Sequence, residues 1–270
     1  MTKLPPRDWS AIYWPEIAGA EPARWIAVLP LAAIEQHGPH LPLSTDVTIA
    51  EAYLARVRAR LPADIPATFL PVQAVGLSTE HLSFPGTLTV STETALKLWT
   101  EIGDSVARAG VRKLVVVTSH GGNSAAMGLV AQELRVRHRM LVVTTGWSRF
   151  GVPDGLFAAD ELRHGIHGGA TETSIMLAHA PELVRADRIA DFQPASVAME
   201  QSYRWLSAQR PAPLAWAAED LHPSGAIGDA SAATAEKGRQ LLDHGAQAFC
   251  ELLDDVHRFD LAALATRPSA

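Results

Sequence analysis

Apolar segments alternate with amphipathic segments along most of the chain. Nearly continuous apolar runs, typical of strands that are buried on both faces, cover residues 25–34, 67–77, 113–119 and 141–147. Apolar residues recur at helical spacing in residues 46–60, 92–110, 123–139, 169–180 and 230–259. This alternation predicts βαβ units, and therefore a three-layer α/β fold with a largely parallel sheet and helices on both faces.

The sequence offers no boundary between domains. It contains no internal repeat, and residues 212–228 read as a Pro- and Gly-rich loop inside one unit. A chain of 270 residues, 47% of them hydrophobic, is long enough to bury a sizeable core. We therefore expect a single domain over residues 1–270, with residues 266–270 as a frayed tail.

Composition limits the available chemistry. With 11 His and one Cys, the chain cannot form an internal disulfide or a Cys-rich zinc cluster, so any metal must be held by His and carboxylates. A single thiol also favours a reducing cytoplasm. The net charge of −6 argues against a nucleic-acid partner, and no apolar run reaches the roughly 20 residues of a membrane span.

The densest polar cluster follows the first predicted strand. Glu35 and His37 are two residues apart in an extended segment, so both can aim at one point while Gln36 faces away. Asp46 follows at the start of the next helix, where an N-cap is the ordinary role of Asp. Because α/β sheets bind ligands beyond the carboxyl ends of their strands, we interpret all three as metal ligands.

A second polar cluster follows the predicted strand at residues 113–119. It consists of His120, Gly121, Gly122 and Asn123. The glycines allow the main chain to approach a bound group, and the helix that begins near Asn123 offers N–H donors to an oxyanion. A tight turn with an incidental His is the alternative.

A third cluster spans residues 164–174 and also leads into a helix. Glu172 lies in the first turn of that helix, where the helix dipole favours a carboxylate in any case. We expect it nevertheless to meet the other two clusters in space.

A charge count favours two ions over one. Glu35, Asp46 and Glu172 bring three negative charges. One divalent ion would leave the site with a net charge of −1, whereas two ions with a bridging hydroxide would make it neutral. A nitrogen and oxygen ligand set with open positions fits a catalytic site for Zn, Mn or Fe. The five predicted ligands are Glu35, His37, Asp46, His120 and Glu172.

Further residues are candidates for the substrate pocket. Ser78, Glu80 and His81 follow a predicted strand, although a plain turn ending in Pro-Gly would explain this loop equally well. Trp147 opens a segment, residues 147–157, that we expect to shape the pocket. Together with Gly121, Gly122 and Asn123, these residues form the predicted substrate contacts.

Five motifs, in this order and spacing, resemble those of the creatininase (creatinine amidohydrolase) family. They are EQHGPHLPLSTD, GLSTEHLSFPGT, SHGGN, HGGATETS and GAIGDASAATAEKG. The resemblance implies that Glu35, Asp46 and His120 hold one metal ion, while His37, the shared Asp46 and a further carboxylate hold another. It also implies a homo-oligomer, often a hexamer, that hydrolyses C–N bonds in cyclic or linear amides, formamides or a cofactor-precursor peptide.

One position departs from the family pattern. Creatininases proper carry a Glu two residues after the motif His, and here that position is Gly122. We therefore assign Glu172 to the second ion, and we do not expect creatinine to be the substrate.

The expected reaction is hydrolysis of a small-molecule amide or formamide. A hydroxide between the ions would attack the carbonyl, with backbone N–H groups near Gly121 and Gly122 stabilising the oxyanion. His167 and Glu172 are the candidate catalytic residues, and His167 would carry a proton to the leaving nitrogen. Alternatively, His167 only orients a ligand carboxylate.

Three other functions remain open. A peptidase acting on a cofactor-precursor peptide would use the same site. A dinuclear phosphoesterase is less favoured because Arg163 is the only cationic side chain beside the metal motifs. A metal-storing or regulatory protein would bind ions without hydrolysis.

Overall fold

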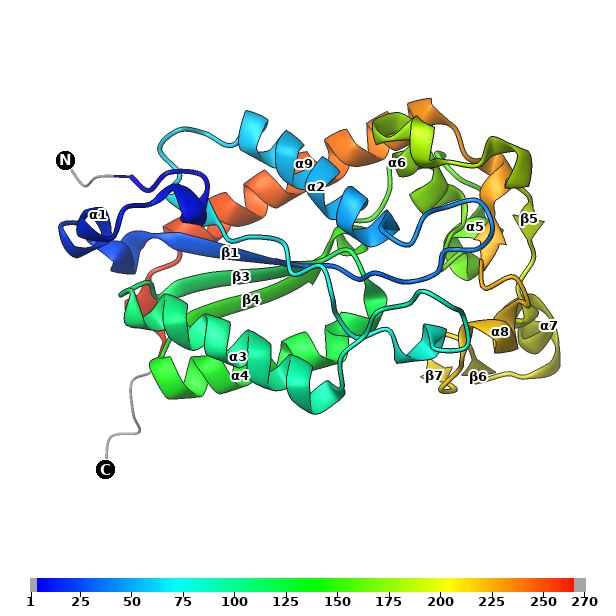
Figure 1. Cartoon of the computed structure of the whole chain (residues 1–270), viewed down its shortest axis with the longest axis horizontal. Helices are drawn as coiled ribbons and strands as arrows, with labels where there is room; N and C mark the ends of the chain where they lie inside the picture. The colour runs from blue at the N-terminus through cyan, green and yellow to red at the C-terminus, as the bar shows by residue number, and fades with distance from the viewer. Residues whose placement is uncertain (1–3, 265–270) are drawn as a thin grey trace.

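The computed structural model describes residues 4–264, and its centre is a four-stranded parallel sheet (Figure 1). The predicted tail at 266–270 lies outside the described residues. Every pairing in this sheet is parallel, which confirms the predicted α/β class. In the order β2-β1-β3-β4, the strands are β2 (Ala67–Phe69), β1 (Ile26–Leu31), β3 (Lys113–Thr118) and β4 (Leu141–Gly146).

Helices cover both faces of the sheet and complete the predicted three layers (Figure 1). Ile26 and Val28 of β1 belong to the core on one face, whereas Ala27 and Leu29 belong to the core on the other, as the alternation of a strand requires. No helix within residues 4–264 is long and apolar enough to cross a membrane. One face carries α2 (Thr45–Arg60), α6 (Ala170–His179) and α9 (Ala235–Arg258), and the other carries α3 (Thr92–Arg108) and α4 (Ser124–His138).

Two predicted elements are shorter than their sequence patterns. Strand β2 has three residues because Pro71 has no N–H to donate, and the chain returns to β1 only at a bridge between Leu31 and Gln73. Helix α9 begins at Ala235 because the side chain of Thr234 caps it by accepting a hydrogen bond from the N–H of Lys237.

Most of the short elements that the sequence did not predict lie within residues 159–229. The region expected to be a loop, residues 212–228, contains β7 (Ala212–Pro213) and α8 (Ala218–Leu221). Most of these elements lie at the end of the molecule toward which the sheet strands run (Figure 1). The short elements are α1 (Trp14–Ala18), α5 (Ala159–His164), β5 (Asp191–Phe192), α7 (Ala195–Ser202), β6 (Leu206–Ser207), β7 (Ala212–Pro213), α8 (Ala218–Leu221) and β8 (Gly228–Asp229).

The strand order reverses beside β1. The chain passes from β1 to β2 on one side and then returns to β3 on the other side of β1. Such a reversal opens a crevice at the carboxyl ends of the two central strands, where open α/β sheets bind their ligands. The segment with Glu35 and His37 leaves β1 there, and the segment with His120 leaves β3 at the same edge.

Candidate metal centre

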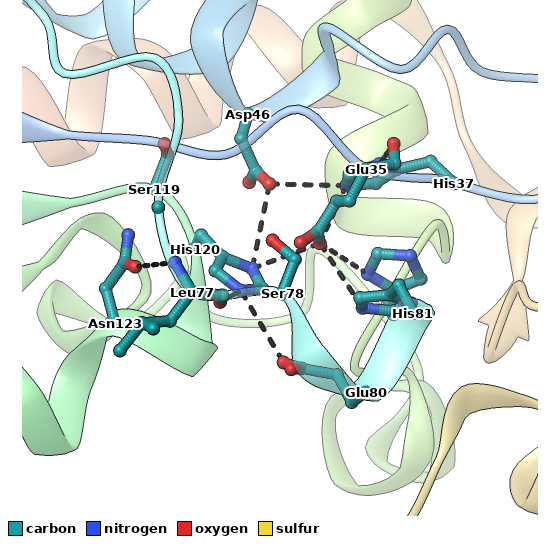
Figure 2. Close-up of polar contacts among 12 residues, drawn as sticks. Glu35, His37, Asp46, Leu77, Ser78, Glu80, His81, Ser119, His120 and Asn123 are labelled. Carbon is teal, nitrogen blue, oxygen red and sulfur yellow. Dashed lines mark hydrogen bonds and ion pairs between the residues drawn. The ribbon is translucent and has the colours of Figure 1, made fainter. Parts of the chain in front are cut away.

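The predicted ligands come together at the carboxyl ends of β1 and β3. Figure 2 shows Glu35, His37, Asp46 and His120 pointing toward one another. His120 Nδ1 lies 3.0 Å from Oε1 of Glu35 and 3.7 Å from Oδ2 of Asp46. His37 Nε2 lies 3.7 Å from Oδ2 of Asp46 and 3.7 Å from Oε2 of Glu172. Two groups with metal-ligand spacing result, Glu35 with Asp46 and His120, and His37 with Asp46 and Glu172. Asp46 belongs to both groups.

Asp46 is not the cap of its helix. Helix α2 begins at Thr45 after the N-cap Ser44, and Oδ2 of Asp46 is buried without a hydrogen-bond partner. The segment that precedes the helix folds back on itself, because the N–H of Glu35 donates to the carbonyl of Leu43 at 3.0 Å. This fold brings the start of α2 beside the end of β1.

Each predicted histidine ligand has one ring nitrogen fixed by a main-chain carbonyl. His37 Nδ1 donates to the carbonyl oxygen of Glu35 at 3.0 Å, and His120 Nε2 donates to that of Leu77 at 2.6 Å. Burial lowers the pKa of His37 to about 4, so its other nitrogen, Nε2, carries a lone pair and faces the carboxylates. Burial also acts to lower the pKa of His120, but the charge of Glu35 outweighs it and raises that pKa to about 10, so a bound cation would take the place of the proton on Nδ1. Metal-ligating histidines are commonly oriented in this way.

Buried polar atoms without partners indicate that the cluster fits cations. Both carboxylate oxygens of Glu35, Nε2 of His37 and Oδ2 of Asp46 are buried, and none has a hydrogen-bond partner among the described residues. Each such atom costs about 1–3 kcal/mol unless something satisfies it. Divalent cations would satisfy all four atoms, and the mixture of imidazole and carboxylate ligands suits Zn, Mn or Fe.

Burial and mutual repulsion shift the pKa values of the carboxyl groups. Burial raises the pKa of Asp46 well above its usual value, and the charge of Glu35 raises it further. Burial likewise raises the pKa of Glu172 to about 7. For Glu35, burial acts in the same direction, but the charge of His120 and its contact with the carboxylate outweigh it and lower the pKa. The cluster thus favours protons or cations as counter-charges.

His167 reaches the same cluster from the loop before α6. Its Nδ1 lies 3.7 Å from Oε1 of Glu35, while its Nε2 donates to the carbonyl of Gln36 at 2.6 Å. Burial lowers the pKa of His167 to about 3, so the ring is neutral and Nδ1 has a free lone pair. Glu35, His37 and His167 also have metal-ligand spacing. The geometry therefore suits both a proton carrier and a ligand.

A cavity of about 820 Å³ opens beside the cluster. This volume lies in the range of pockets that enclose a drug-sized ligand. Part of the wall is apolar and includes Ile49, Tyr53 and Leu241. The predicted site residues that line the cavity are Glu80, His81, His120, Gly121, Gly122, Trp147, His167 and Glu172.

Two predicted substrate contacts, Asn123 and Ser78, do not line this cavity. Asn123 is fully buried, where its Oδ1 accepts from the N–H of Leu77 at 2.9 Å and its Nδ2 donates to the carbonyl of Ala32 at 3.1 Å. Ser78 is also fully buried, and its N–H donates to Oγ1 of Thr89 at 2.9 Å. Asn123 thereby holds the loop that carries Glu80 and His81, whereas Oγ of Ser78 is buried without a hydrogen-bond partner among the described residues. The sequence pattern alone does not reveal either environment.

The structure leaves no room for a side chain at residue 122, the position at which the sequence departs from the family pattern. A Cβ at residue 122 would overlap Nε2 of His120 and would lie 2.6 Å from the carbonyl oxygen of Leu77. Oε1 of Glu80 lies 2.7 Å from the same point and 3.5 Å from Nε2 of His120. The carboxylate of Glu80 therefore occupies the space that a side chain at residue 122 would need.

The sequence pattern missed the role of Gln36. Alternation predicts only that its side chain faces away from those of Glu35 and His37. Its amide is nevertheless buried against His81 and His167, with Nε2 2.8 Å and 3.2 Å from a nitrogen of each ring. Alternation predicts the direction of a side chain, but not which distant segments meet it on the other side.

Comparisons with known proteins agree with this geometry. Residues 10–253 match the sequence model of the family described as "Creatininase: Creatinine amidohydrolase". The chain is 36% identical over 248 residues to the mycofactocin precursor peptide peptidase of Mycobacterium ulcerans, covering 87% of this chain and 84% of that protein. It is 31% identical over 234 residues to the creatinine amidohydrolase of Pseudomonas putida, covering 81% and 84%. A solved mutant creatininase described as Zn-Zn type has a TM-score of 0.74 and 26% identity, covering 94% of this chain and 100% of that chain.

Proposed function

The chain belongs to the creatininase family of C–N bond hydrolases, and we propose that it hydrolyses an amide or formamide other than creatinine with the help of two divalent cations. One observation carries the proposal. Two groups of buried ligands share Asp46, and four of their polar atoms have no hydrogen-bond partner among the described residues. A carboxylate that belongs to two ligand sets would keep two ions close together, as the two-metal mechanism of hydrolases needs.

The proposed ions are Zn, Mn or Fe. Glu35, Asp46 and His120 would hold one ion, and His37, Asp46 and Glu172 the other. When bound, such ions polarise a carbonyl group and lower the pKa of an attacking water. The similarity to a creatininase described as Zn-Zn type supports the proposed pair of ions.

The protein's own side chains would position the substrate and move the proton. His167 Nδ1 would take a proton from the attacking water and deliver it to the leaving nitrogen, because a neutral amine leaves far more readily than its anion. Gly121 and Gly122 line the cavity, and their main-chain amides would donate to the developing oxyanion. Glu172 would face the substrate, since it lines the cavity with a side chain that is 22% exposed, whereas that of Glu35 is fully buried.

A peptide is the second candidate substrate. The similarity to a mycofactocin precursor peptide peptidase favours it, and the cavity is larger than a compact cyclic amide needs. A peptide bond is itself an amide, so the same cations, oxyanion donors and proton carrier would serve. The apolar wall around Tyr53 and Trp147 would then accept a side chain next to the bond that is cleaved.

A substrate screen tests the proposal. Zinc-loaded protein and chelator-treated protein would be assayed against amides, formamides, short peptides and a chromogenic phosphate ester. We expect metal-dependent turnover in at least one of the C–N classes. Turnover of the phosphate ester alone would favour a phosphoesterase, and bound metal without turnover of any substrate would favour metal storage.

The homo-oligomer and the cytoplasmic location are also proposals. Leu129 and Val136 of α4 are 62% and 69% exposed, and they offer an apolar surface for contact between subunits. Cys250 is a buried free thiol, which suits a reducing compartment. Light scattering would count the subunits, including the six that the family resemblance implies, and a monomer would contradict the first proposal.

A further inference from the structure

The side-chain amide of Gln36 has an unambiguous orientation. Its Oε1 accepts a hydrogen bond from the N–H of Gly38 at 2.8 Å, and its Nε2 donates to the carbonyl of Gly225 at 3.0 Å. A main-chain N–H can only donate and a main-chain carbonyl can only accept, so the two ends of the amide cannot be exchanged. The amide is also tightly enclosed, because a Cβ at residue 225 would overlap it.

This orientation determines which nitrogen of His81 carries the proton. The remaining hydrogen of Gln36 Nε2 points at Nδ1 of His81, 2.8 Å away, so this ring nitrogen must accept. The proton of the neutral ring therefore resides on Nε2. That nitrogen lies 3.3 Å from Oε1 of Glu35, at the edge of the metal cluster (Figure 2).

The ring of His167 lies beside that of His81 but is turned the other way. Its Nε2 lies 2.6 Å from the carbonyl oxygen of Gln36 and must donate to it, so its Nδ1 carries the lone pair. The 3.2 Å separation between Nε2 of Gln36 and Nε2 of His167 joins two donors and is not a hydrogen bond. The two rings stack at 4.3 Å between centroids.

We propose that Gln36 is a positioning residue that fixes His81 and His167 in the same tautomer with opposite edges toward the metal cluster. His81 then presents an N–H donor, and His167 presents a nitrogen acceptor. The catalytic use of these two edges rests on the proposed function, the hydrolysis of an amide. An amide has a carbonyl oxygen that can accept from His81, and its hydrolysis needs a group such as His167 that can take up a proton.

Burial supports the neutral state of both rings. His81 is 1% exposed and His167 is 6% exposed. Burial disfavours a charged imidazole, so each ring carries one proton, and the hydrogen bonds of Gln36 set its position. Gln36 contacts both rings, one through its side chain and the other through its carbonyl. Gln36, which lies between two predicted ligands in the sequence, therefore sets which edge of each ring carries the proton.

Nitrogen NMR of the zinc-loaded protein tests the inference without relying on activity. Histidine rings labelled with ¹⁵N distinguish protonated from unprotonated nitrogens, and His81→Phe and His167→Asn variants would assign the two rings. We expect Nε2 to be protonated and Nδ1 unprotonated in both rings. A proton on Nδ1 of His81 in the wild-type protein would overturn the inference.

The Gln36→Glu variant separates the two histidines. A carboxylate cannot donate to His81, so Nδ1 of that ring should become protonated, while His167 should not change because it binds a main-chain carbonyl. An unchanged His81 would contradict the inference. If this variant does not fold, Gln36→Met serves instead, and His81 should then lose its single protonation pattern.

Kinetics give a second readout for the same variants. We expect kcat to fall about 10- to 100-fold with a smaller change in KM and an unchanged zinc content, as is typical when a supporting residue is lost. Gln132→Glu, an exposed site on α4, is the matched control and should leave all three values unchanged. An unchanged kcat in Gln36→Glu would overturn the positioning role. If no amide is hydrolysed even by the wild type, the proposed function fails while the NMR result still decides the tautomers.

Discussion

Replacing His167 with Asn separates the two roles that its position allows. In the wild-type protein, Nε2 donates to the carbonyl of Gln36 and Nδ1 faces Oε1 of Glu35 at 3.7 Å. The Asn Oδ1 would lie near the present site of Nδ1, so a polar atom stays in place. The side-chain amide, however, has no basic nitrogen and cannot take up a proton near neutral pH.

The expected loss follows from the role of the ring. Positioned proton transfer contributes roughly 10²- to 10⁴-fold to a rate. At 1.36 kcal/mol for each tenfold, the variant should lose about 3–5 kcal/mol of transition-state stabilisation. Losing the donor to the buried carbonyl of Gln36 should lower the free energy of unfolding by about 1–3 kcal/mol, a part of the roughly 5–15 kcal/mol typical of a folded domain, so the variant should still fold.

The assay compares kcat and zinc content in the same preparations. We expect His167→Asn to lose most of its turnover while it binds as much zinc as the wild type. His138→Asn is the matched control, because this histidine pairs with Asp104 at 2.6 Å on the opposite face of the sheet. Loss of zinc together with activity would refute the proton-carrier role and make His167 a ligand.

Three further predictions concern the surroundings of the site. Gly122→Ala should lower the free energy of unfolding by about 1–3 kcal/mol and weaken zinc binding, because the new Cβ would press on Leu77 and His120. Gly121→Ala is the control, since a Cβ there meets open space, and it should change neither property. Denaturation and zinc titration of both variants measure the difference. Glu161→Gln should lower the free energy of unfolding, measured in urea, by about 1–3 kcal/mol. The carboxylate accepts hydrogen bonds from the N–H groups of Ala170 and Asp229 at 2.6 Å and 2.7 Å, and an amide can accept only one of them. Exposed Glu51→Gln is its control, and an equal loss there would contradict the reasoning. Zinc binding near pH 7 should release protons and should weaken as the pH falls, because the raised pKa values of Asp46 and Glu172 let protons compete with the ion. Calorimetry in buffers of different ionisation enthalpy should detect the released protons.

The fold was predictable where long patterns exist. Apolar runs located all four strands of the sheet, and helical spacing located the five long helices to within a few residues. The early end of β2 depends on Pro71 and its neighbours rather than on hydrophobicity. The short elements between residues 186 and 229 are two to eight residues long, too short to show a period, and tertiary contacts rather than local pattern determine them.

The site was predictable in part, for a similar reason. Glu35, His37 and His120 follow buried strands, so the topology of an α/β sheet was enough to expect them at one edge. Whether a side chain faces the cavity or the interior depends on partners far away in the sequence. Gln36 is held by Gly225, 189 residues away, and Asn123 by Leu77, 46 residues away. No local pattern contains that information.

The ratio of zinc to protein tests the dinuclear site most directly. After zinc loading and removal of excess metal, elemental analysis should find two ions per chain in the wild type. Glu172→Gln should retain one ion, because Glu172 belongs to only one of the two groups that share Asp46. Asp46→Asn should lose both ions, because the shared carboxylate belongs to both groups. A wild-type protein with a single ion, or an Asp46→Asn variant that still holds two, would contradict the account.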